Sequence, residues 1–174
     1  MKRLSLALTV AAIVLAAPLA QSQTISADAL ASEIRASGAR AVLVKYFETP
    51  VWINSIRPGI ESGSDKWLRI AEQLYKESDG AGTEELGEAI YNALPNRPFA
   101  VLREFARTSP EASVESFCDI SFEYEVPKEG VHGYLQRVRK ALASAKTKQE
   151  KAIAAACRRG LVKTEAEAKR LGLR

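Results

Sequence analysis

The sequence predicts an all-α protein, and three observations support that prediction. Apolar residues recur at intervals of three and four over most of the chain, which is the period of a helix with one buried face. Ser, Thr or Pro precedes these stretches, and Gly or Pro follows them, as at helix ends. Only residues 120–126 alternate apolar and polar side chains. We expect a single compact domain of about seven to nine mostly short helices plus one long basic C-terminal helix.

Residues 1–22 have the pattern of a secretory signal peptide. A basic start precedes an uncharged, mostly apolar run from Leu4 to Leu15, and Ala20-Gln21-Ser22 places small residues before the expected cleavage site. The apolar run is too short to span a membrane, and no Cys follows it for lipid attachment. We therefore expect secretion across the inner membrane, a periplasmic location, no stable membrane anchor, and one mature helical domain, residues 23–174.

Start signals place each expected helix in turn. Residues that can cap or begin a helix are Ser26, Thr49, Ser64, Thr83, Ser109 and Thr164. Thr83 is followed by Glu84 and Glu85, which the dipole of a helix favours in its first turn. The expected helices therefore cover residues 26–38, 42–47, 49–58, 64–77, 83–94, 99–106, 110–118, 134–160, and a short stretch from 164.

The C-terminal region contains the longest apolar stripe. Its members at helical spacing are Leu135, Val138, Leu142, Ala145, Gln149, Ala152 and Ala156. We expect one long helix that ends at Gly160. Before this helix, Pro127, Gly130 and Gly133 predict a loop, and His132 lies within it.

Residues 120–126 allow two interpretations. Ile120, Phe122, Tyr124 and Val126 alternate with polar residues, but no second strand is evident to pair with them. The segment could lie extended across helices with its apolar side chains inward. It could instead offer an open edge to a partner, and Phe122 and Tyr124 are then the candidate partner-binding residues.

Charge is unevenly distributed along the mature chain. Residues 23–133 hold 11 basic and 18 acidic residues, whereas residues 134–174 hold 12 basic and 3 acidic ones. The basic end could attract an acidic partner, or it could pair with the acidic remainder within one fold. It lacks the interleaved aromatic residues that stack on bases, so we expect no nucleic-acid partner.

Two cysteines are present, Cys118 and Cys157. In an exported chain an even count predicts a disulfide between them. Two buried free thiols are the alternative.

The stretch from Trp52 to Cys118 resembles a group of small exported helical proteins of Gram-negative bacteria. The residues that carry the resemblance are Trp52 with Ile56, Ser62-Gly63-Ser64-Asp65-Lys66-Trp67-Leu68, Asp79-Gly80-Ala81-Gly82-Thr83-Glu84-Glu85-Leu86, Ala93-Leu94-Pro95-Asn96-Arg97-Pro98, Val101-Leu102 and Cys118. These are aromatic anchors, caps and turns. The resemblance implies a periplasmic location and a helical fold, and it implies no catalytic residue.

No complete catalytic or metal-binding motif occurs in the sequence. His132 is the only histidine, and no nucleophile stands near it. We therefore expect no catalytic residues, no cofactor and no metal site. The predicted function is non-enzymatic binding of another exported protein, in an inhibitor, immunity-like or adaptor role. The alternative is a hydrolase of the cell wall or of an exported substrate that uses carboxylates such as Glu84, Glu88 or Asp119.

Overall fold

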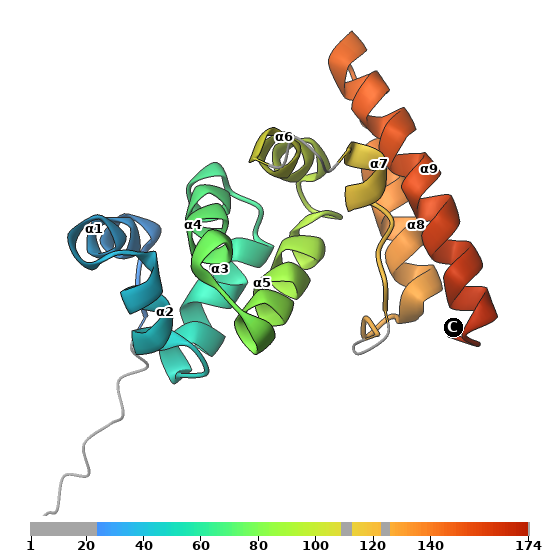
Figure 1. Cartoon of the computed structure of the whole chain (residues 1–174). Coiled ribbons are helices and arrows are strands. Elements are labelled where there is room, and N and C mark those ends of the chain that lie inside the picture. The colour runs from blue at the N-terminus through green and yellow to red at the C-terminus, as the bar shows by residue number, and fades with distance from the viewer. Residues whose placement is uncertain (1–23, 109–112, 123–125, 174) are drawn as a thin grey trace, which may run out of the picture.

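The computed structural model describes residues 24–108, 113–122 and 126–173, and it confirms the all-α fold class. The expected signal peptide lies outside the described residues. Regular structure in the described ranges consists of α1 Ala27–Ser37, α2 Ala39–Tyr46, η1 (a π-helix) Trp52–Ile56, α3 Arg57–Glu61, α4 Asp65–Glu77, α5 Gly80–Ala93, α6 Pro98–Thr108, α7 Val114–Phe117, α8 Gly130–Leu142 and α9 Lys148–Arg170 (Figure 1). Within these ranges, none of the helices is long and apolar enough to cross a membrane.

The helices follow one another across the molecule, from α1 at one end to α8 and α9 at the other (Figure 1). Packing is mostly between helices close in the chain, such as α1 with α2 and α4, α3 with α5, and α8 with α9. One buried apolar cluster runs from Leu30 in α1 to Ala168 in α9. The shared core makes the described part of the chain one domain.

The N-terminal helix signals have mixed outcomes. The Ser26 hydroxyl caps α1, and Gly38 ends it with a φ of 87°, as predicted. The prediction that Thr83 caps a helix is wrong, because α5 begins three residues earlier at Gly80. Thr83 lies inside α5, where its hydroxyl is 2.9 Å from the Ser78 hydroxyl.

The single long helix predicted for residues 134–160 is wrong in its bounds. α8 ends at Leu142, and α9 starts afresh after Thr147. The Thr147 hydroxyl accepts a hydrogen bond from the Glu150 backbone N–H, and the Glu150 carboxylate accepts one from the Thr147 N–H. This reciprocal capping begins a new helix. The long basic helix is therefore α9, which continues through Gly160, and the separate helix expected from residue 164 is its last part.

α7 is fixed to α9 by covalent and polar contacts. The predicted disulfide joins Cys118, directly after α7, to Cys157 in α9. The buried Thr164 hydroxyl accepts a hydrogen bond from the Ile120 N–H at 2.8 Å and donates one to the Cys118 carbonyl oxygen at 3.1 Å. The disulfide and these two hydrogen bonds hold residues 118–120, directly after α7, against α9.

Candidate functional site

Two adjoining cavities form a groove, which is bordered by η1, α3, α5 and the described residues 120–122 and 126–129 between α7 and α8. The larger, of about 860 Å³, is called the Arg57 cavity here after one of its three cationic lining residues, which also include Lys128 and Arg137. The smaller, of about 540 Å³, is called the aromatic cavity. Residues that line both are Glu48, Glu85, Glu88, Asn92, Val126 and Pro127. Because they share this border, the two cavities are parts of one surface.

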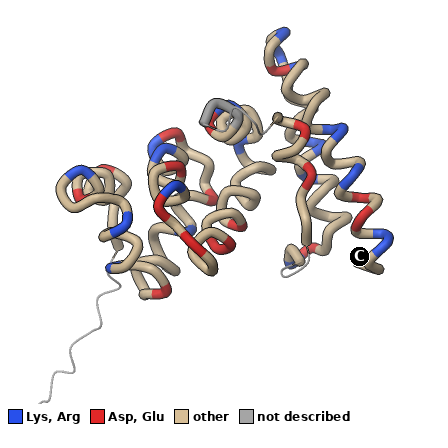
Figure 2. Tube along the Cα trace, viewed as in Figure 1, with Lys and Arg blue, Asp and Glu red and all other residues tan. Residues whose placement is uncertain are grey.

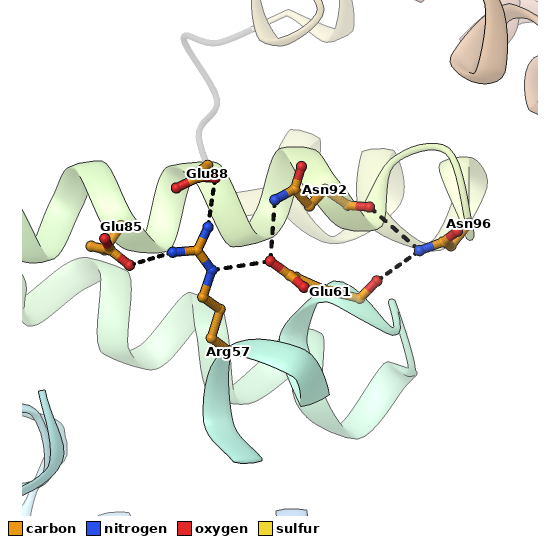
Figure 3. Close-up of polar contacts among 6 residues, drawn as sticks. All are labelled: Arg57, Glu61, Glu85, Glu88, Asn92 and Asn96. Atoms are coloured by element: carbon orange, nitrogen blue, oxygen red, sulfur yellow. Dashed lines mark hydrogen bonds and ion pairs between the residues drawn. The ribbon is translucent and has the colours of Figure 1, made fainter. Parts of the chain in front are cut away.

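Arg57, the first residue of α3, holds three carboxylates in the Arg57 cavity (Figure 3). Its Nε donates to Glu61 Oε1 at 3.1 Å, one turn along the same helix. Its Nη1 donates to Glu85 Oε2 at 2.8 Å, and its Nη2 lies 2.5 Å from Glu88 Oε1. Glu85 and Glu88 are three apart on α5, so both face Arg57. The guanidinium thus joins α3 to α5.

Two asparagines of the α5 region complete this cluster (Figure 3). The Asn92 side chain donates to Glu61 Oε1 at 3.1 Å, and the Asn96 side chain donates to the Glu61 carbonyl oxygen at 3.0 Å. Burial lowers the pKa of Arg57, but the bond to Glu61 and the charges of Glu88 and Glu85 outweigh it and raise that pKa above its ordinary value. Arg57 therefore stays charged, and the cluster of one cation and three carboxylates is net negative.

The aromatic cavity combines negative charge with aromatic rings. Its acidic lining residues are Glu48, Glu84, Glu85 and Glu88, and no Lys or Arg is among the described residues that line it. Its aromatic lining residues are Phe47, Tyr75, Tyr91, Phe122 and Tyr134. Acidic residues recur along α5, whereas Lys and Arg residues recur along α9 (Figure 2). This cavity is suited to a group that is both cationic and apolar.

Tyr134 fixes one side of the aromatic cavity. Its hydroxyl donates to the Tyr91 carbonyl oxygen at 2.9 Å, and the Phe122 ring packs edge-on against its ring at 5.6 Å. Burial raises the pKa of both Tyr134 and Tyr91, so both phenols are neutral at physiological pH. Tyr134 belongs to α8, so the contact between its ring and the Phe122 ring packs Phe122 against that helix.

Exposed apolar side chains concentrate at the groove. Six large apolar residues of the described part are exposed, and three of them, Ile53, Tyr75 and Val126, line the cavities. Their exposed fractions are 59%, 42% and 45%. Apolar side chains that are gathered on a surface mark interaction sites more often than scattered ones.

The backbone beside the groove departs from regular geometry at two places. Glu48, which lines both cavities, has a φ of 60°, the only positive φ among the described residues other than glycine. The helical stretch that follows contains η1, where the Arg57 N–H donates to the Trp52 carbonyl oxygen five residues back. Pro58 explains the change of period, because a proline cannot donate within a helix and its ring crowds the preceding turn. Such departures are frequent at functional sites.

Trp52 contributes a hydrogen-bond donor without an acceptor. Its side chain is 2% exposed and lines the Arg57 cavity. Its indole N–H is buried and has no hydrogen-bond partner among the described residues. An unmet buried donor is costly, and this one is closed off from the surface of the cavity.

The structure brings only some of the predicted site residues to the groove. Phe122 lines the aromatic cavity half-buried, whereas Tyr124 lies outside the described residues. Glu84 and Glu88 border the groove, but Asp119 is exposed and is not among its lining residues. The expectation that His132 lies in a loop is wrong, because it belongs to the first turn of α8.

His132 has a polar neighbour on its own helix. Its Nε2 is 2.8 Å from the Gln136 side-chain nitrogen. Cys118 and Cys157 form a disulfide away from both cavities. Across the described ranges, no group of three or more His, Cys, Asp or Glu side chains could hold a metal ion.

Sequence reasoning missed the centre of the site. Arg57 lies in a stretch expected to end at Pro58, and its partners on α5 are 28 and 31 residues further along the chain. The one local signal was Arg57 followed four residues later by Glu61, which is the spacing of an ion pair on a helix. The contribution of Glu85 and Glu88 depended on the packing of α3 against α5.

Comparison of the chain with protein-family models, curated proteins and solved structures finds no match. The resemblance of residues 52–118 to small exported helical proteins therefore stays a prediction. Any functional conclusion depends on the groove itself.

Proposed function

We propose that this protein is a non-enzymatic periplasmic protein that binds another exported protein through the groove. The observation that carries the proposal is the concentration there of half of the exposed large apolar side chains among the described residues, beside an excess of carboxylates. Apolar anchors surrounded by charged residues are typical of sites where proteins bind one another. The role is that of an inhibitor, an immunity-like factor or an adaptor.

The carboxylate-based hydrolase is the alternative, and the Arg57 cluster weighs against it. Such hydrolases need two carboxyl groups that face the substrate. Glu61, Glu85 and Glu88 each direct a carboxylate oxygen at the Arg57 guanidinium, so this arrangement suits a structural and electrostatic role.

Site-specific photo-cross-linking in living cells tests the proposal. A benzophenone amino acid replaces Ile53 at the groove, and the matched control replaces Val162 on α9, since the two side chains are 59% and 61% exposed. We expect a discrete adduct with one other protein from position 53 and none from position 162. The identified partner should then bind the purified protein, and Tyr75→Ala should weaken that binding.

Two results would reject the proposal. One is the absence of any adduct at positions 53, 75 and 126. The other is the release of soluble peptidoglycan fragments by the purified protein, with a rate that Glu88→Gln abolishes, since this result supports the hydrolase. The intact mass of protein taken from the periplasm tests export separately, and we expect the mass of residues 23–174.

A further inference from the structure

We propose that the partner presents an extended segment with a Lys or Arg side chain, and that this side chain enters the aromatic cavity. The inference rests on the proposed function and specifies the chemistry that the groove recognises. Three features carry it, namely the unbalanced charge of the aromatic cavity, its aromatic walls and its continuation into the Arg57 cavity.

Charge determines the sign of the group that the cavity accepts. Four glutamates line the aromatic cavity without a Lys or Arg among its described lining residues. Arg57, Lys128 and Arg137 line the neighbouring cavity, where Arg57 contacts three carboxylates and Arg137 pairs with Glu129. Glu48 and Glu84 border the aromatic cavity outside that cluster. A cation entering here gains charge-assisted contacts that a neutral group does not.

The aromatic walls determine the shape of that group. Tyr75 is partly exposed, and Phe47 and Phe122 are half-buried at the same cavity. Aromatic faces attract ammonium and guanidinium groups and also pack against an alkyl stem. A Lys or Arg side chain supplies both the stem and the charge, whereas a bare metal ion would use neither property of the walls.

The adjoining Arg57 cavity indicates that the cation belongs to a longer segment. The two cavities share a border, and the exposed apolar side chains of Ile53 and Val126 lie along the Arg57 cavity. An extended peptide continues on both sides of its Lys or Arg residue, so one segment could place a cation among the glutamates and apolar neighbours against Ile53 and Val126, close to Trp52. An isolated small cation would occupy the aromatic cavity alone.

A pair of synthetic peptides tests the inference with the ¹⁵N-labelled mature protein. The first is acetyl-Ala-Leu-Arg-Leu-Ala-amide, and the second carries citrulline, which has nearly the same shape but no charge, in place of Arg. We expect about tenfold weaker binding of the citrulline peptide. The sequence has two tryptophans, so two indole N–H signals are observable. That of Trp52 should shift on binding, whereas that of Trp67, outside the groove lining, should not.

Charge-removing variants locate the cation. Glu48→Gln combined with Glu84→Gln should weaken binding of the Arg peptide about fivefold without disturbing the ion pairs of Arg57. Glu77→Gln is the control, because Glu77 is an exposed carboxylate on α4 that does not line the groove. Equal loss in Glu77→Gln would show that only net charge matters and would overturn the inference.

Two further outcomes separate this inference from the proposed function. Equal affinity for the Arg and citrulline peptides overturns the cationic segment, and an adduct at position 53 would then still support protein binding. If N-acetyl-arginine amide binds as tightly as the Arg peptide and the Trp52 signal stays still, the site takes small cations and the peptide inference is wrong.

Discussion

Replacing Gly160 with Ala should destabilise the protein, although the same change usually stabilises a helix. Gly160 lies inside α9 against the backbone of α7, and an Ala Cβ there would be 2.2 Å from the Glu115 carbonyl oxygen and 2.7 Å from the Cys118 carbonyl carbon. Ordinary contact begins at 3.4 Å, so α7 must move by about 1.2 Å. The disulfide and Thr164 oppose that movement.

The expected cost follows from two opposing effects. Ala is favoured over Gly in a helix interior by about 0.8–1 kcal/mol. Overpacking a rigid contact costs about 1–3 kcal/mol, and sometimes more, and the obstructing atoms here belong to the backbone. We expect the free energy of unfolding to fall by about 1–2 kcal/mol, which lowers the melting temperature by about 2–8 °C in a domain of this size.

Thermal unfolding followed by circular dichroism measures this effect. Gly87→Ala is the matched control, since Gly87 also lies inside a helix, α5, but an added Cβ would meet nothing within 4 Å. We expect Gly87→Ala to raise the melting temperature. If Gly160→Ala raises it as well, then α7 does not pack tightly against α9, and the reasoning fails.

Three further predictions concern the same half of the molecule. Replacing Cys118 and Cys157 with Ser should lower the free energy of unfolding by about 4 kcal/mol, because the bridge closes a loop of about 40 residues, and an unchanged urea midpoint would contradict this. Leu142→Ala should cost about 2–5 kcal/mol by the same urea assay, because Leu142 is fully buried; a loss below 1 kcal/mol would show that α8 is not docked. Backbone hydrogen bonds from Thr147 and Lys146 lower the pKa of Glu150. The ionised Glu150 therefore stabilises the folded protein at pH values above the ordinary carboxyl pKa near 4.3, and this contribution is lost as the pH falls through the lowered pKa of the folded state. Amide protection at the start of α9 should therefore decrease below about pH 4, after correction for intrinsic exchange, and Glu150→Gln should remove this pH dependence.

Local chemistry was sufficient to predict the helices but not all of their ends. The Ser26 cap and the Gly38 stop depend on residues adjacent in the chain, and both predictions are confirmed. A glycine such as Gly160 is typical of a helix end, yet α9 continues through it. The residue is a glycine because α7 packs so closely there that a side chain has no room. A glycine that permits a turn and one that permits close approach look alike in a sequence.

The candidate site shows the same division. The sequence identified Phe122 as a partner-binding candidate, and it predicted the Cys118–Cys157 bridge from cysteine count and expected export. It did not identify Arg57, because the ion pairs of Arg57 with Glu85 and Glu88 exist only when α3 packs against α5. From the sequence, Glu85 was expected in the first turn of a helix, and Glu88 was only a candidate carboxylate of the alternative hydrolase.

By itself, the sequence determined the all-α class, the buried face of α8 and the disulfide partners. These follow from a helix period of 3.6 residues and from having only two cysteines, neither of which depends on distant contacts. The predicted continuation of the apolar stripe into α9 is wrong, because Gln149 and Ala152 are exposed in a helix that starts afresh after Thr147. The tertiary structure decided where α8 ends, why Gly160 is a glycine and which charges share one cavity. Those features depend on distances between residues far apart in the chain, and such distances are set when the helices pack.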